Sequence, residues 1–480
     1  MLVGKTVKNY IYNLIYQLLV LMAPIILSPY LARVLGADNL GMYSYISSCV
    51  SLLSTIVLLG TYSYGSRQIA YTRDNLIESN VVFWNVTLIR LILGIIGIVV
   101  FGIIAATSDC FTYFMLYLPW LIASIIDVSW LFIGMEDMRP TALKNAFIKI
   151  ASVILIFMFV KSTSDLWKYI FLMAASTLIA NFALLIQCKK YIKKFKLCIL
   201  QWKSILKDSI MLFLPQVAVL LYLQVDKIML KELTLEASQV AFYDQAEKIV
   251  TIPLTFITIL STVIMPKIAN SYAKDNRVEI NRVIMNVAKY SLFAAVPMMF
   301  GIASVAKGLI PWYLGNDFLP VGTAIKILAP IVVLNSLIGI SGNQYFTATN
   351  QLKVLLFSNV IAAVVNICLN AIFIPKFQYA GAAIATVASA VVSIIIQYTV
   401  LGRQMNIKPI AISFIKYTAL SIPMLLVVSI ISRKMTGSPI TTFMEIAIGC
   451  IAYILMCALA KDEVFFSVMG IVLNIFRKGK

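Results

Sequence analysis

The sequence predicts an all-α integral membrane protein with about fourteen transmembrane helices. Apolar stretches of about twenty residues recur from Tyr10 to Leu459, and at a rise of about 1.5 Å per residue each can cross a hydrocarbon core of about 30 Å. The composition agrees, since 61% of the residues are hydrophobic and 12% are charged, unlike a soluble domain. The apolar runs are also continuous, whereas the strands of a membrane barrel alternate apolar and polar residues.

The predicted spans follow one another with short turns that leave no room for a soluble domain. In chain order they cover residues 10–31, 40–59, 81–105, 111–132, 141–160, 169–186, 210–230, 241–265, 287–305, 321–340, 354–374, 380–401, 412–431 and 440–459. The first run follows Lys5 and Lys8 and contains Pro24 and Pro29. Because it is longer than the apolar core of a signal peptide, we expect a retained first helix.

The net charge of +19 serves first as a topology signal, because Lys and Arg are concentrated in the cytoplasmic turns of a multi-pass protein. With a cytoplasmic N-terminus, the even-numbered turns and the C-terminal tail carry most of the basic residues. The richest turn contains Lys189, Lys190, Lys193, Lys194, Lys196, Lys203 and Lys207. We therefore expect a bacterial cytoplasmic (inner) membrane protein with both termini in the cytoplasm, and no nucleic-acid partner.

Several classes of protein lack support in the sequence. The seven cysteines show no CxxC spacing and there is no histidine, which removes the commonest metal ligand and the usual general base. The turns contain neither a glycine-rich phosphate loop nor an ATP-binding unit. We expect no cofactor, no metal site and no enzyme activity.

The chain contains an internal repeat. A copy starting at Pro24 aligns with one starting at Pro215, and Tyr43 then pairs with Tyr243, at an offset of about 200 residues, or six helices. An even number of crossings keeps the two copies in the same orientation, which predicts two pseudo-symmetric six-helix lobes around a central cavity. The predicted parts are an N-terminal lobe at 1–188, a basic linker at 189–207, a C-terminal lobe at 208–402, two extra helices at 403–460 and a tail at 461–480. A chance likeness of apolar helix pairs is the alternative.

Charged residues within the spans are the first candidates for a site, because each costs about 2.5–3.5 kcal/mol to insert and so faces a cavity or a partner. Arg90 and Asp127 lie at similar depth in neighbouring spans, where they form either a mutual salt bridge or part of a cavity. Lys326 has no acidic residue in its own span and is placed in the cavity or at the outer interface.

Further candidates lie at span ends or are uncharged. The substrate-binding candidates are Arg90, Lys326, Arg33, Arg67, Lys307, Gln216 and Asn343. The candidates for ion coupling are Asp127, Asp226 and Glu247. Asn366 and Asn370 share one helix face and either pack between helices or meet sugar hydroxyls.

Local motifs along the whole chain resemble one known family. They are LARVLGADNLGMYSY, WLFIGMEDM, VDKIML, AFYDQAEKI, MPKIANSYAKD and NICLNAIFIPKFQYAGAAIATVAS. In this order they resemble the polysaccharide-transporter family of the multidrug/oligosaccharidyl-lipid/polysaccharide flippase superfamily, which includes flippases for O-antigen and capsule repeat units. The resemblance implies that polyprenyl-pyrophosphate-linked oligosaccharide moves from the inner to the outer leaflet by alternating access. It also implies that the last two spans form a groove, as in lipid II flippases.

Two other functions stay open at this stage. A multidrug antiporter of the same superfamily would need cavity carboxylates for organic cations, and the first span has none. A membrane polysaccharide polymerase or ligase would need a sizeable external loop. Membrane lipids are expected partners, and the sequence leaves open the coupling ion, H⁺ or Na⁺, and a complex with a polymerase.

Overall fold

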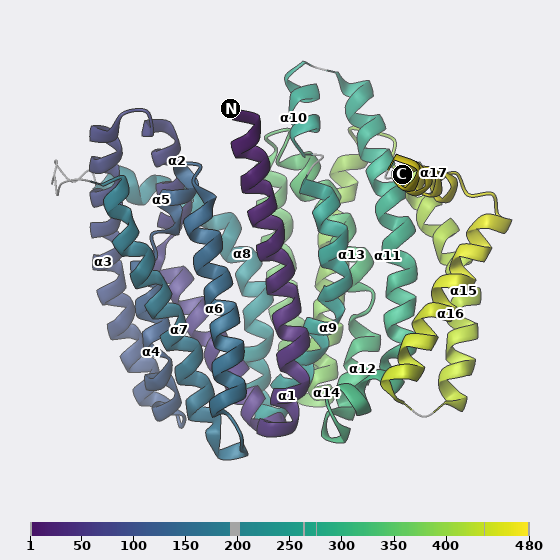
Figure 1. The fold of residues 1–480 in the computed structure, drawn as a ribbon, viewed down its shortest axis with the longest axis horizontal. Coiled ribbons are helices and arrows are strands. Elements are labelled where there is room, and N and C mark those ends of the chain that lie inside the picture. Colours follow the sequence, from purple (N-terminus) through teal and green to yellow (C-terminus); the bar gives the residue numbers. More distant parts are fainter. Residues whose placement is uncertain (1, 193–201, 263–264, 275, 436, 479–480) are drawn as a thin grey trace. The chain divides into compact units, whose positions relative to one another are not determined.

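The protein is helical throughout the part of the chain that its computed structural model describes (Figure 1). That part comprises residues 2–192, 202–262, 265–274, 276–435 and 437–478. The chain divides into two compact units. Unit 1 is Met1–Lys231 with Glu236–Ala241, and unit 2 is Glu232–Leu235 with Phe242–Lys480.

The elements of the first half run from α1 to α8. They are α1 (Leu2–Leu58), α2 (Thr61–Thr72), α3 (Leu76–Thr107), α4 (Phe111–Ile126), α5 (Ser129–Gly134), α6 (Met138–Phe159), η1 (Thr163–Asp165), α7 (Leu166–Gln187), η2 (Cys188–Lys190) and α8 (Trp202–Thr234).

The elements of the second half run from α9 to α17. They are α9 (Ala237–Thr262), α10 (Met265–Ala273), α11 (Arg277–Tyr313), η3 (Asn316–Phe318), α12 (Leu319–Leu328), α13 (Ile331–Ile338), η4 (Gly339–Phe346), α14 (Leu352–Gly402), α15 (Lys408–Lys434), α16 (Pro439–Leu459) and α17 (Glu463–Lys478).

The prediction of an all-α multi-pass membrane protein is confirmed. Within the described residues nine helices are long and apolar enough to span a membrane, and one bent pair, Asn316–Leu328 with Ile331–Phe346, is a tenth candidate. Helices α1 and α14 each contain one non-helical residue, Gly36 and Gln378 respectively, so each is two helices joined at a sharp turn. Both turns fall between predicted spans. The count of fourteen stays a prediction.

The two halves of the chain repeat one order of elements. A pair of long helices is followed by a short helix, α2 or α10, then by a long helix, α3 or α11. A broken helix comes next, α4–α5 in one half and α12–α13 in the other, and two more long helices follow. This order of elements agrees with the predicted repeat of six helices.

The division between the units differs from the predicted linker at 189–207. Helix α8 is grouped with unit 1 as far as Lys231, and residues 193–201 lie outside the described part of the chain. Gly60 supplies one physical reason, because it turns the chain in a left-handed conformation (φ +71°). An added Cβ there would lie 2.6 Å from the Ser209 carbonyl oxygen, so α8 packs directly on this turn. The predicted lobe boundaries stay predictions.

The WLFIGMEDM motif forms the buried centre of unit 1. Trp130 is fully buried and stacks on Phe83, with ring centroids 5.5 Å apart. The acidic residues of the motif lie at the surface, where Glu136 pairs with Arg73 at 2.5 Å and Asp137 accepts hydrogen bonds from Lys190 Nζ and the Tyr191 hydroxyl. The motif therefore anchors the α5–α6 turn.

Apolar side chains on the outside of the helices mark the lipid-facing surface. Along α3, Ile95, Val99 and Ile103 are 64%, 59% and 60% exposed. An apolar stripe of this kind is a liability in water and favourable against hydrocarbon. In unit 2 the tail helix α17 starts at a buried carboxylate, because Asp462 pairs with Lys416 at 2.5 Å and accepts a hydrogen bond from the Phe465 N–H.

We predict that Gly134→Ala destabilises the protein by about 1–3 kcal/mol, the usual cost of overpacking a filled core. The new Cβ would lie 2.7 Å from both the Ser66 carbonyl oxygen and the Ile69 Cβ. Gly102→Ala is the matched control, since it meets nothing within 4 Å and improves helix propensity. Thermal unfolding in detergent measures both, and equal stability of the two variants would contradict this packing.

Candidate functional site

The fourth predicted span is broken in the middle of unit 1. Helix α4 ends at Ile126, Asp127 is extended (φ −64°, ψ 119°), and α5 begins at Ser129. A break of this kind leaves the last carbonyls of α4 without their helical partners. Lipid cannot replace those hydrogen bonds, so polar side chains from neighbouring helices must supply them.

Arg90 on α3 supplies most of these hydrogen bonds. Its guanidinium donates from Nη2 to the Ser124 carbonyl at 2.6 Å, from Nε to the Ile125 carbonyl at 3.3 Å, and from Nη1 to the Thr61 hydroxyl at 3.1 Å. The side chain is buried, and a cation at a helix C-terminus also meets the negative end of the helix dipole. Of the two alternatives for Arg90 and Asp127, a mutual salt bridge or part of a cavity, the structure contradicts the salt bridge, because Arg90 caps α4 instead.

Lys144 on α6 is the partner of Asp127. Its ammonium donates to Asp127 Oδ1 at 3.4 Å, to the Ser129 hydroxyl at 2.8 Å and to Asn181 Oδ1 at 2.9 Å. Asp127 Oδ1 also accepts from the Ser129 N–H and hydroxyl at 3.1 and 2.6 Å, which caps α5. Asn181 completes the network by donating to the Ala123 carbonyl at 2.8 Å. One carboxylate and two cations therefore surround the break.

A cavity of about 410 Å³ opens beside this network within unit 1. A second cavity of about 400 Å³ adjoins it, and Arg90 and Asp127 line both. We call the first one the polar cavity. Its polar lining includes Ser54, Thr55, Arg90, Ser124, Asp127, Lys144, Asn145, Thr177 and Asn181.

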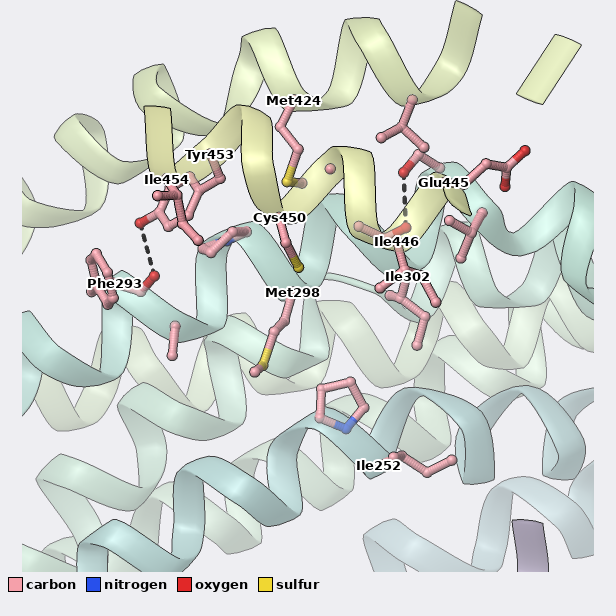
Figure 2. Close-up of a pocket in the computed structure, with 18 of the residues that line it drawn as sticks. Ile252, Phe293, Met298, Ile302, Met424, Glu445, Ile446, Cys450, Tyr453 and Ile454 are labelled. Atoms are coloured by element: carbon pink, nitrogen blue, oxygen red, sulfur yellow. Dashed lines mark hydrogen bonds between the residues drawn. The ribbon is translucent and has the colours of Figure 1, made fainter. Parts of the chain in front are cut away.

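Unit 2 contains a larger and almost wholly apolar groove of about 700 Å³ (Figure 2). Helices α9, α11, α15, α16 and α17 form it, with Met298, Met424 and Ile446 among the lining side chains. The Tyr453 hydroxyl donates to the Phe293 carbonyl at 2.8 Å across the groove, as Figure 2 shows. The last two predicted spans, now α15 and α16, thus share one groove with α11.

The other predicted site residues do not line the polar cavity. Asp226 is fully buried and Glu247 is partly buried, next to Lys248, which pairs with Asp244 at 2.5 Å. The exposed candidates are Arg33 and Arg67 in unit 1, and Lys307, Lys326 and Asn343 in unit 2. The side chain of Gln216 lies outside the described residues. Among the predicted residues whose side chains the structure describes, Arg90 and Asp127 are the two that line the polar cavity.

A pair of buried asparagines lies in unit 2. Asn370 Nδ2 donates to Asn366 Oδ1 at 3.1 Å, and both side chains are fully inaccessible. Their shared helix face, expected from the spacing of four residues, brings the amides together. This contact favours the packing role over a direct contact with sugar.

Sequence reasoning missed two charged residues that the structure makes prominent. Lys144 lies one turn inside its predicted span, where a lysine is also typical of a cytoplasmic span end. Glu445 lines the apolar groove and is 2% exposed, and its Oε2 has no hydrogen-bond partner among the described residues. A charged residue inside an apolar span was the available signal in both cases.

Sequence comparison identifies the family. Residues 6–271, more than half of the chain, match the profile described as "Polysaccharide biosynthesis protein". The chain belongs to this family. Curated relatives of this family member include a "Putative O-antigen transporter" of Escherichia coli K12, 24% identical over 221 residues, or 45% of the chain and 53% of the relative. The chain thus spans about half the length of that relative.

Three further proteins are similar to this chain. A "Probable low-salt glycan biosynthesis flippase" of Haloferax volcanii is 25% identical over 174 residues, which is 36% of this chain and 37% of the relative. Among solved structures, the lipid II flippase MurJ in an inward closed conformation superposes with a TM-score of 0.74, covering 94% of this chain and 98% of MurJ at 18% identity. An inward-facing multidrug transporter of the MATE family gives 0.63, covering 81% and 98% at 15% identity. The family member therefore shares its fold with these two transporters.

We predict that Lys144→Met and Asp127→Asn each destabilise the protein by about 1–3 kcal/mol, because each leaves a half-buried charge without its partner. The double variant removes both charges and should cost less than the sum of the two single changes. Lys190→Met is the control, since its pair with Asp137 is largely exposed and worth less than about 1 kcal/mol. Thermal unfolding of the four variants measures the coupling, and strict additivity would exclude the ion pair.

Proposed function

We propose that the protein is a flippase that moves polyprenyl-pyrophosphate-linked oligosaccharide repeat units from the inner to the outer leaflet of the bacterial cytoplasmic membrane. The observation that carries the proposal is the presence of two chemically opposite sites in one chain. Unit 1 has a polar cavity with buried cations, and unit 2 has a long apolar groove. A lipid-linked glycan is a ligand with both chemistries.

The apolar groove suits the polyprenyl tail. Helices α9, α11, α15, α16 and α17 form it, and the polar side chains of its wall are few, namely Ser304, Thr442, Glu445 and Tyr453. Each CH₂ group buried in such a groove is worth about 0.8 kcal/mol. A groove of about 700 Å³ therefore holds part of a long isoprenoid and leaves the rest in the bilayer.

The pyrophosphate requires cations that it can reach. Lys144 and Arg90 are largely buried at the helix break, so the exposed cations on each unit are the better candidates. They are Arg33 and Arg67 in unit 1, and Lys307 and Lys326 in unit 2. Alternating access of the two lobes would carry the head group across, with cytoplasmic termini and with H⁺ or Na⁺ coupling through Asp226 or Glu247 as further parts of the proposal.

A multidrug antiporter is the competing function, because the MATE neighbours share the fold. Organic cations need a free carboxylate. In the polar cavity the carboxylate of Asp127 is engaged by the Lys144 ammonium, and Arg90 adds a second cation nearby. This net positive charge disfavours a cationic substrate.

We predict that cells lacking the protein accumulate polyprenyl-linked oligosaccharide on the cytoplasmic face of the inner membrane and lose surface glycan. Mass spectrometry of extracted lipids and glycan staining at the cell surface measure the two effects. Restored export by a plasmid copy is the control. Normal surface glycan combined with sensitivity to cationic drugs would reject the flippase and support the antiporter.

We also predict that Gly301→Leu lowers glycan export at least several-fold at unchanged protein abundance. Gly301 lines the groove, and an added Cβ there meets only the Met424 methyl, at 3.9 Å, so a larger side chain at this position is expected to fill space that the tail would use. Gly102→Leu on α3, where an added Cβ meets nothing within 4 Å, is the matched control. Normal export by Gly301→Leu would remove the groove from the transport pathway.

A further inference from the structure

The hydroxyl groups around the polar cavity have already used their protons. The Ser54 and Thr55 hydroxyls both donate to the Ser51 carbonyl, at 3.0 and 2.9 Å. The Ser124 hydroxyl donates to the Leu121 carbonyl at 2.7 Å. Each hydroxyl oxygen keeps lone pairs that can accept a hydrogen bond, so these residues present acceptors to the cavity.

Thr177 on the opposite helix, α7, follows the same pattern. Its hydroxyl donates to the Met173 carbonyl at 2.9 Å. Asp127 adds a stronger acceptor, a carboxylate oxygen. Among the described residues, every hydrogen bond to this carboxylate goes to Oδ1, and none goes to Oδ2. The cavity wall is therefore rich in acceptors.

Donors are scarcer in the same cavity. All three protons of the Lys144 ammonium are directed to Asp127, Ser129 and Asn181. Arg90 uses three of its five N–H groups on the protein, which leaves two. The amide of Asn145 makes no hydrogen bond within the described residues and adds two N–H groups and one carbonyl.

An aromatic ring gives the cavity one flat apolar wall. Trp120 lines it and stacks on Tyr117, with ring centroids 5.7 Å apart and planes 14° apart. The stacking fixes the orientation of the indole. The cavity thus combines many acceptors, a few donors and one flat apolar face.

We propose that the polar cavity binds one sugar residue of the lipid-linked glycan, an assignment that rests on the proposed flippase function. A sugar offers many hydroxyl donors to Asp127 Oδ2 and to the serine and threonine oxygens. Its few acceptors, such as a carboxylate or an N-acetyl carbonyl, meet Arg90 and Asn145. The volume of about 410 Å³ is within the usual range of small-molecule sites.

The donors and acceptors of the polar cavity do not suit the pyrophosphate or the isoprenoid tail of the substrate. A pyrophosphate has only acceptors, and it would meet the lone pairs of Asp127 and of the hydroxyls at close range. An isoprenoid tail would leave the polar groups of the cavity without partners. Of the three parts of the substrate, the sugar is therefore the one that fits the polar cavity beside the α4–α5 break.

The test compares two lipid probes on the full-length protein in nanodiscs by native mass spectrometry. One probe is bare polyprenyl pyrophosphate, and the other is the same lipid carrying a single sugar, in a panel of N-acetylhexosamine, neutral hexose and uronic acid. The variants are Thr177→Val and Asn145→Ala. The matched control is Thr399→Val, which removes an equivalent hydroxyl that donates to the Ile395 carbonyl on an exposed helix face of unit 2.

We predict that each cavity variant weakens binding of the best sugar-bearing probe about three- to tenfold, the effect of one lost hydrogen bond. Binding of the bare lipid should change less than twofold, and Thr399→Val should change neither. A thermal melt confirms that each variant is folded.

Other outcomes separate the two proposals. Equal losses for both probes would assign the cavity to the pyrophosphate and overturn the sugar site, while the flippase stands. Unchanged binding of both probes would also overturn the sugar site. Failure of the wild-type protein to bind any of the lipids would reject the proposed function itself.

Discussion

Satisfying the backbone at the α4–α5 break is the constraint on which unit 1 depends. The last carbonyls of α4 have no helical partners, and hydrocarbon offers none. Arg90 and Asn181 supply three of the missing donors, and Asp127 caps the start of α5. The polar side chains needed for this repair also line the cavity.

Each charge at the break has polar partners within the protein. Two cations and one carboxylate lie within one network, so the insertion cost of each is shared with a partner. Lys144 is saturated by its three acceptors, whereas Asp127 and Arg90 retain free hydrogen-bonding capacity. A ligand can therefore bind beside the network without breaking it. In unit 2 the groove solves the opposite problem, since apolar side chains line a space that an isoprenoid can fill.

Part of the site at the α4–α5 break could be predicted from the sequence. Arg90 and Asp127 were found because a charge inside an apolar span is costly and rare. The alternative of a mutual salt bridge is contradicted by the structure. A sequence indicates how deep a residue lies in the membrane, but helix packing decides the direction in which its side chain points. Lys144 was missed as the partner of Asp127, because a lysine near a span end is also typical of a cytoplasmic turn.

The sequence by itself determined the membrane class, the order of helices and the breaks at Gly36 and Gln378, because hydropathy and turn residues act locally along the chain. The WLFIGMEDM and internal-repeat patterns likewise came from the sequence. Only the tertiary structure decided which side chains meet: Lys144 with Asp127, Arg90 with the end of α4, and α11 with α15 and α16 around the groove. Those contacts join residues 17 to about 160 positions apart, and no local pattern specifies the rotation and approach of helices that bring such residues together.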